Sequence, residues 1–76
     1  MKTGIRQEAR RLLSRANLRR TVPRLAVLGV LLEEGRPVTH EQITAKLEET
    51  APNKVTIYRV LESLVEANIV HKAFLR

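Results

Sequence analysis

Helix start and stop signals leave this 76-residue chain few ways to fold. Thr21 offers a hydroxyl N-cap, and Pro23 follows in the first turn, where its missing N–H costs nothing. Gly35 can supply the left-handed residue that ends the same helix. The segment from Thr39 to Gln42 fits the capping box, in which the threonine and glutamine side chains each bond the other residue's backbone N–H. These signals predict a mainly α fold.

The second half of the chain carries similar signals. Pro52 ends a helix expected over residues 40–50, because the residue before a proline is pushed out of helical geometry. Asn53 is a good N-cap for the next helix, and Asn68 is a tolerable left-handed residue at its end. Residues 69–75 are then expected to form a strand.

Apolar spacing predicts how two of these helices pack. The run from Leu25 to Leu32 is apolar on almost every face, which is typical of a central core helix. In the following helix, apolar side chains gather on one side of a 100° wheel, and Thr56 and Tyr58 lie on its two shoulders. The residues expected to be most buried are Leu25, Leu28, Leu32, Ile57, Leu61 and Leu64.

Positive charge is concentrated near the N-terminus. The net charge is +6, yet residues 1–24 alone hold eight basic side chains against Glu8, which leaves the rest of the chain slightly acidic. Residues 3–16 also place apolar side chains at helical spacing behind a possible Thr3 N-cap, so they predict an amphipathic basic helix. Such asymmetry favours a polyanionic partner, either nucleic acid or an acidic membrane surface, over a merely solvated arginine-rich face.

Several function classes fit the sequence poorly. A chain of 76 residues has little room for a deep active site, and its paired glutamates resemble solvated helix ends, so we do not expect an enzyme. It has no cysteine, and its two histidines, His40 and His71, lack a third nearby ligand, so we expect no metal site. The longest apolar run is too short to cross a bilayer. We therefore expect a cytoplasmic protein without a membrane partner.

The helix that begins after Asn53 has the features of a DNA-recognition helix. A short helix, a proline-containing turn, a second helix and a strand together indicate a winged helix-turn-helix, whose second helix enters the major groove. There Arg59 can donate twice to guanine, while the Tyr58 ring or the methyl groups of Val55 and Thr56 can meet a thymine methyl. In the alternative interpretation, Tyr58 caps the edge of the core and Arg59 pairs with Glu62 or Glu66.

Residues 18–75 resemble the N-terminal DNA-binding domain of the ferric uptake regulator (Fur) family of bacterial metal-responsive repressors. The resemblance rests on LRRTVPRLAVLGVL, VTHEQITAKL and VTIYRVLESLVEANIV, in that order. It implies sequence-specific binding to double-stranded DNA, with Tyr58 and Arg59 reading bases and Arg19 in a minor groove. The base-reading candidates are Val55, Thr56, Tyr58 and Arg59. The candidates for phosphate or minor-groove contact are Arg11, Arg15, Arg19, Arg20 and Lys54.

The chain also departs from this family. Arg36 and Pro37 stand where members often supply a metal-binding histidine, so no cofactor is expected in this chain, although the family implies Fe, Zn or Mn for a full-length protein. We interpret residues 1–76 as one winged-helix domain with an extra basic N-terminal helix and a truncated wing. The family's dimerisation and metal-binding domain is absent from it, and a homodimer is expected only with that domain.

Two other functions remain open at this stage. The first is a winged-helix protein-interaction module without direct DNA binding, in which the face bearing Tyr58 and Arg59 meets a partner protein. The second is membrane-surface binding by the first helix, which requires Ile5, Leu12 and Leu13 to face lipid. We expect these three side chains to cover the core or a neighbouring subunit instead.

Overall fold

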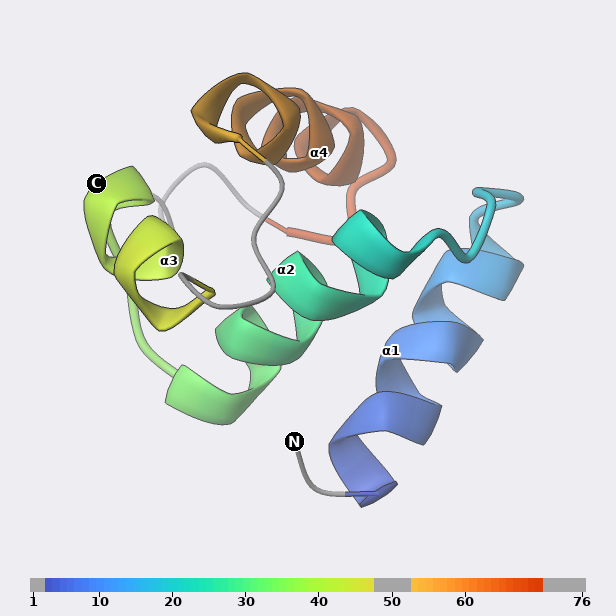
Figure 1. Ribbon diagram of the computed structural model, residues 1–76. Helices are drawn as coiled ribbons and strands as arrows, with labels where there is room; N and C mark the ends of the chain where they lie inside the picture. The colour runs from blue at the N-terminus through green and yellow to red at the C-terminus, as the bar shows by residue number, and fades with distance from the viewer. Residues whose placement is uncertain (1–2, 48–52, 71–76) are drawn as a thin grey trace.

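The computed structural model describes residues 3–47 and 53–70 of the chain, which form four helices there (Figure 1). Their bounds are α1 Thr3–Arg15, α2 Val22–Glu34, α3 His40–Lys46 and α4 Lys54–Glu66. Helix α2 lies at the centre and packs against each of the other three, and α3 also packs against α4. No strand lies within the described residues, so the prediction of a mainly helical fold is confirmed. This arrangement is compatible with a helix-turn-helix formed by α3 and α4.

The predicted caps of α2 and α3 are confirmed. The Thr21 side chain accepts a hydrogen bond from the Arg24 backbone N–H, and Gly35 ends α2 in the left-handed region, with φ 63°. Thr39 and Gln42 form both bonds of the capping box, at 2.9 and 3.0 Å. The start of α3 is therefore fixed independently of α4.

Two asparagines in the left-handed region end α1 and α4, each with φ 59°. After α1, Leu18 N–H donates to the Leu13 carbonyl and Asn17 N–H to the Ser14 carbonyl. This pair of bonds defines a Schellman motif, and Asn68 ends α4 in the same way. The role of Asn68 was predicted from the sequence, whereas that of Asn17, which sets the path of the chain toward α2, was not.

Three predicted boundaries were wrong within the described residues. Helix α3 ends at Lys46, because Leu47 turns away with φ −101° and ψ 11° to bury its side chain in the core. Thr3 already lies in α1 and does not precede it. Ile69 and Val70 form a bend whose N–H groups bond the Leu64 carbonyl, not the start of a strand. The rest of the predicted strand, residues 71–75, lies outside the described residues.

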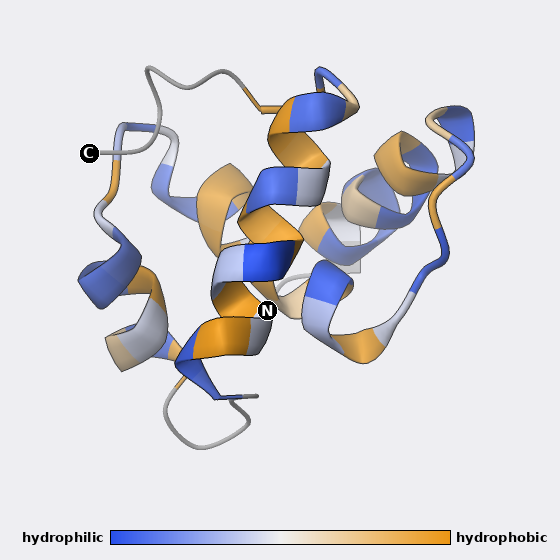
Figure 2. Ribbon diagram, turned by 90° about the horizontal axis from the view of Figure 1, so that it is seen from above, coloured by the Kyte–Doolittle hydropathy of each residue, from blue (hydrophilic) through white to orange (hydrophobic). Residues whose placement is uncertain are grey.

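All four helices contribute buried apolar residues to one core, and hydrophobic and hydrophilic positions both occur along the helices (Figure 2). Leu28, Ile57, Leu61 and Leu64 are buried as predicted. Leu25 and Leu32 are only half-buried, against prediction, because these two residues lie seven positions apart on the same side of α2, at the rim of the core. The largest fully buried side chains are Leu13, Val27, Leu28, Ile43, Ile57 and Leu64.

Helix α1 belongs to this core. Ala9 and Leu13 are fully buried, and Leu12 packs partly buried beside them. The membrane-surface alternative required Leu13 to face lipid, and the structure instead turns it toward the core. None of the described helices is both long and apolar enough to span a membrane.

Candidate nucleic-acid interface

Helix α4 buries one side and exposes the other. Ile57, Leu61 and Leu64 are buried on the inner side, where they pack in the core shared with α2 and α3. Side chains spaced three or four residues apart cover the outer side. We call this exposed row the α4 stripe; its members are Val55, Tyr58, Arg59, Glu62 and Glu66. Tyr58 is 59% exposed and Val55 is 58% exposed, so both present apolar surface to solvent on this side of the helix.

Charge changes sign along the outer side of α4. Lys54 and Arg59 lie in the half that begins the helix, whereas Glu62 and Glu66 lie in the half that ends it. Phosphates attract the first half and repel the second, so a polyanion would be met by the start of the helix. This gradient was not predicted, although the order of the charged residues in the sequence shows it.

Arg59 makes no ion pair with any residue in the described part of the chain. The alternative interpretation paired this guanidinium with Glu62 or Glu66 and placed Tyr58 at the edge of the core. Both glutamates are present within one or two turns, yet neither contact forms. The guanidinium is therefore available to donate to an external acceptor.

Thr56 is placed differently from the other base-reading candidates. It is half-buried, and its hydroxyl donates to the Asn53 side-chain oxygen at 3.1 Å. Its backbone N–H donates to the same oxygen at 2.9 Å, which completes the N-cap of α4. The hydroxyl is thus engaged within the protein, and the methyl group is the part of Thr56 that is left for an apolar contact.

The ring of His40 lies beside the ring of Tyr58. The ring centroids are 6.0 Å apart, and the ring planes are tilted by 54°. The contact joins the first residue of α3 to the α4 stripe. Sequence reasoning could not have found it, because helical spacing relates residues within one helix and says nothing of how two helices meet.

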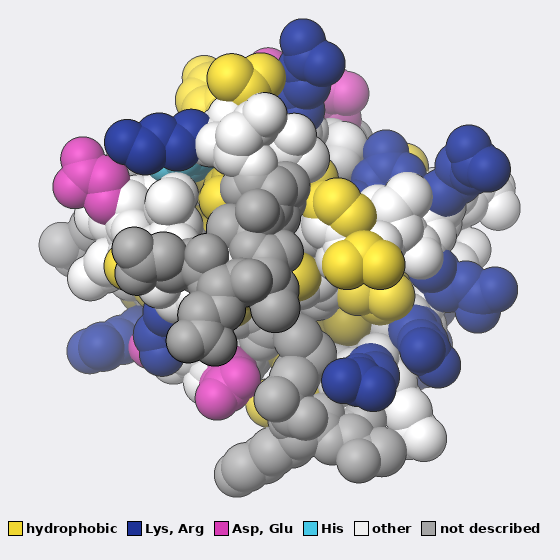
Figure 3. Space-filling model, viewed as in Figure 1, with side chains coloured by type: hydrophobic (Ala, Val, Ile, Leu, Met, Phe, Trp, Pro, Cys, Tyr) yellow, Lys and Arg dark blue, Asp and Glu magenta, His cyan; other side chains and the backbone are white. Residues whose placement is uncertain are grey.

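Lys and Arg side chains gather over α1 and over the connection between α1 and α2 (Figure 3). Of the predicted phosphate contacts, Arg15, Arg19 and Arg20 are exposed. Arg11 is exposed as well, but its Nη2 donates to both carboxylate oxygens of Glu8, at 2.6 and 2.7 Å. Its charge is therefore partly compensated before any ligand arrives.

The backbone around Arg19 is held from both sides. The Schellman motif at Asn17 fixes the chain where it leaves α1, and Thr21 caps α2 just after. Between them, the Arg24 guanidinium donates from Nη1 to the Arg19 carbonyl at 3.2 Å. The Arg19 side chain thus projects from a connection that is fixed by hydrogen bonds.

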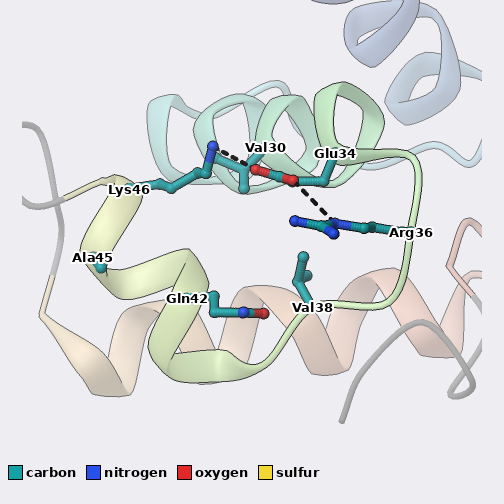
Figure 4. A pocket seen from close by; sticks show the side chains of 7 residues that line it. All are labelled: Val30, Glu34, Arg36, Val38, Gln42, Ala45 and Lys46. Atoms are coloured by element: carbon teal, nitrogen blue, oxygen red, sulfur yellow. Dashed lines mark ion pairs between the residues drawn. The ribbon is translucent and has the colours of Figure 1, made fainter.

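An ion-pair cluster joins the end of α2 to α3, beside a cavity of about 240 Å³ (Figure 4). The Glu34 carboxylate pairs with Lys46 of α3 and lies 3.6 Å from the Arg36 guanidinium. The hydrogen bond from Lys46 lowers the pKa of Glu34, and the same bond raises the pKa of Lys46. Because Glu34 lies on α2 and Lys46 on α3, their ion pair joins the two helices. We call this ion-pair cluster the clamp between α2 and α3.

Metal ligands are not grouped within the described residues. No set of three His, Asp or Glu side chains comes together there, and the chain has no cysteine. His40 contacts Tyr58 and belongs to no group of three such ligands among the described residues, and His71 lies outside them. The described side chains therefore do not fit a closed metal site.

The chain matches the model of a known protein family. A family model described as the ferric uptake regulator family matches residues 15–76. The matched region contains α2, α3 and α4, together with the last residue of α1. No curated protein and no solved structure matches the chain significantly.

Proposed function

This chain belongs to the ferric uptake regulator family of transcription regulators, and on that premise we propose that it binds double-stranded DNA sequence-specifically. In this proposal, the first half of α4 enters the major groove and reads base edges. The observation that carries it is the α4 stripe, in which Val55, Tyr58 and Arg59 stand exposed above a fully packed inner side. An exposed row of this kind on the second helix of a helix-turn-helix matches the geometry of groove recognition.

The side chains of the α4 stripe, together with Thr56, divide into groups with different chemical roles. Arg59, which has no ion-pair partner among the described residues, donates two hydrogen bonds to O6 and N7 of a guanine. Val55 and the Tyr58 ring offer apolar surface to a thymine methyl. Thr56 contributes its methyl group, because its hydroxyl donates to the side chain of Asn53, the N-cap of α4. Glu62 and Glu66 keep the second half of the helix away from the phosphates.

Basic side chains outside the stripe supply affinity. Lys54, Arg15 and Arg20 are exposed and suited to phosphate contact, which positions a protein on DNA without reading its sequence. Arg19 enters an adjacent minor groove, where a narrow A·T-rich segment has enhanced negative potential. Arg11 joins the phosphate contacts when it releases Glu8. We further propose that the DNA-bound protein represses transcription and that, in a protein that also carries the family's dimerisation domain, two copies occupy a two-fold site.

Proteins of this family generally respond to a divalent metal. The described residues do not form a site for such an ion, and DNA recognition as proposed here uses none of them as metal ligands. The base and phosphate contacts of α1 and α4 are hydrogen bonds, apolar contacts and charge interactions. We therefore expect that chelation of divalent metal leaves the binding of this chain to DNA unchanged.

A protein-interaction role is the second candidate. The observation that favours it is the exposed apolar surface of Val55 and Tyr58, which suits the core of a protein interface. The two functions differ in their response to salt. DNA binding through several phosphates weakens steeply as salt rises, whereas a complex built on these two side chains does not.

Selection from a random pool of duplexes tests the proposal. Several rounds should enrich a common sequence, and fluorescence anisotropy should then give a linear fall of log affinity with log salt concentration. The same titration in EDTA and in Zn²⁺ should give the same affinity. No enrichment, together with no salt-dependent binding to any duplex, would overturn DNA binding in favour of a protein partner.

A further inference from the structure

The contact between His40 and Tyr58 lies outside the roles assigned so far. A centroid separation of 6.0 Å with a tilt of 54° falls within the range in which two aromatic rings attract each other. Tyr58 is otherwise 59% exposed on the outer side of α4, where few neighbours limit its rotation. The imidazole of His40 is thus the aromatic group that flanks this phenol ring from α3.

His40 itself is held firmly. The capping box at Thr39 and Gln42 fixes the turn on which it stands, and its carbonyl accepts a hydrogen bond from the Thr44 hydroxyl at 3.0 Å. Helix α3 is in turn joined to α2 by the ion pair between Lys46 and Glu34. The imidazole is therefore presented to Tyr58 from a fixed support.

One ring nitrogen of His40 forms no hydrogen bond with the described residues. The Nε2 atom of His40 is shielded from solvent and has no hydrogen-bond partner among the described residues. A shielded nitrogen without a partner opposes folding, and such atoms in native proteins call for an explanation. The explanation that we give for His40 is that its ring contributes by packing against Tyr58 and not by forming a hydrogen bond through Nε2.

We infer that His40 is a positioning residue for DNA recognition, which acts through Tyr58 and touches no base. Its ring limits the orientations of the phenol in the free protein, so that less freedom is lost when α4 meets the base edges. This inference rests on the proposed function, because it assigns Tyr58 to base recognition. It predicts that His40 affects sequence preference more than overall affinity.

The contact between His40 and Tyr58 can be tested by fluorescence of the protein without DNA. Tyr58 is the sole tyrosine and the chain has no tryptophan, so its intrinsic fluorescence comes from this ring. His40→Ala should increase the local motion of Tyr58 in time-resolved anisotropy and its quenching by acrylamide. His40→Phe, which keeps a ring without ring nitrogens, should restore both values. Unchanged motion and quenching in His40→Ala would overturn the inference without any DNA.

DNA binding supplies the second readout. His40→Ala should lower affinity for the selected duplex by about threefold to tenfold, the range expected for one aromatic pair, while affinity for a random duplex and the salt slope stay the same. His40→Phe should recover the preference. Glu41→Gln, an exposed substitution at the next position of α3, is the matched control and should alter both duplexes equally.

The outcomes separate this inference from the proposed function. If the wild type prefers no duplex, DNA reading itself fails, and the role of His40 in it fails too. If the wild type keeps a preference that His40→Ala does not lower, or that His40→Phe fails to recover, the inference alone is overturned. Circular dichroism melts check the fold, and His40→Leu, which keeps apolar volume without a ring, replaces His40→Ala if that variant unfolds.

Discussion

The side-chain oxygen of Asn53 accepts two hydrogen bonds from Thr56, one from its backbone N–H at 2.9 Å and one from its hydroxyl at 3.1 Å. Asn53 thereby starts α4 two residues before Val55, the first member of the α4 stripe. The bond from the hydroxyl occupies the one hydrogen that the Thr56 side chain could donate to a base. Asn53 therefore affects both the stability of α4 and the groups of Thr56 that can contact a base.

Substitution at Asn53 should separate these two effects. Asn53→Ala removes the cap and should lower the free energy of unfolding by about 0.5–2 kcal/mol. Asn53→Asp keeps the acceptor and adds a negative charge, which is favourable at a helix start, so stability should be preserved. That charge faces the proposed phosphates, and DNA affinity should fall. Urea melts and DNA titrations on both variants measure this, and equal stability losses would contradict the capping role.

Two neighbouring leucines test whether α1 is part of the fold. Leu13 is fully buried and Leu12 is half-buried beside it. Leu13→Ala should lower the free energy of unfolding by about 2–5 kcal/mol, enough to unfold most of a domain this small. Leu12→Ala should cost clearly less. Circular dichroism melts decide the matter, and a similar small effect of both would mean that α1 is not packed on α2 in solution.

Local signals made most of the helical fold predictable. Thr21, Gly35, Asn53 and Asn68 each satisfy backbone groups within a few residues, so their roles depend little on the rest of the chain. The early end of α3 was not predictable, because Leu47 leaves helical geometry to reach a core that other helices build.

In the candidate site, the exposed side of α4 was predictable from the sequence, whereas the contacts between helices were not. Helical spacing placed Val55 and Arg59 opposite the buried residues of α4, as the structure does. The ring of His40 beside Tyr58 and the pairing of Glu34 with Lys46 join different helices. Such contacts depend on the angle and position at which two helices pack, and residue spacing within one helix does not determine either.

The clamp between α2 and α3 should make stability depend on pH. Lys46 lowers the pKa of Glu34 below its ordinary value of 4.5. As the pH falls, Glu34 is therefore protonated at a higher pH in the unfolded chain than in the folded protein. The contribution of Glu34 is therefore present in full above pH 4.5 and is lost as the pH falls through the folded-state pKa.

Thermal melts at pH 6 and pH 3 measure this loss. The melting temperature of Glu34→Gln should change less between the two values than that of the wild type. Glu33→Gln, the exposed neighbour, should follow the wild type. A wild-type pH dependence retained in full by Glu34→Gln would show that the ion pair does not form in solution.

The contact between Glu8 and Arg11 should restrain DNA binding. Glu8→Gln releases the Arg11 guanidinium for a phosphate, so affinity should rise on selected and random duplexes alike, and the salt slope should steepen by about one unit. In an Arg11→Ala background the same substitution should change the slope little. Anisotropy titrations over a range of salt concentrations give both slopes. Equal gains in the two backgrounds would indicate only a general charge effect.

Competition binding by Arg59→Ala tests base reading by the α4 stripe most directly. The variant is titrated against the duplex selected by the wild type and against a random duplex, with Arg15→Ala as the control that loses the same charge from a proposed phosphate contact of α1. We predict that Arg59→Ala loses about 1–3 kcal/mol on the selected duplex and little on the random one, whereas Arg15→Ala weakens both equally. Equal losses of Arg59→Ala on the two duplexes would contradict base reading by α4.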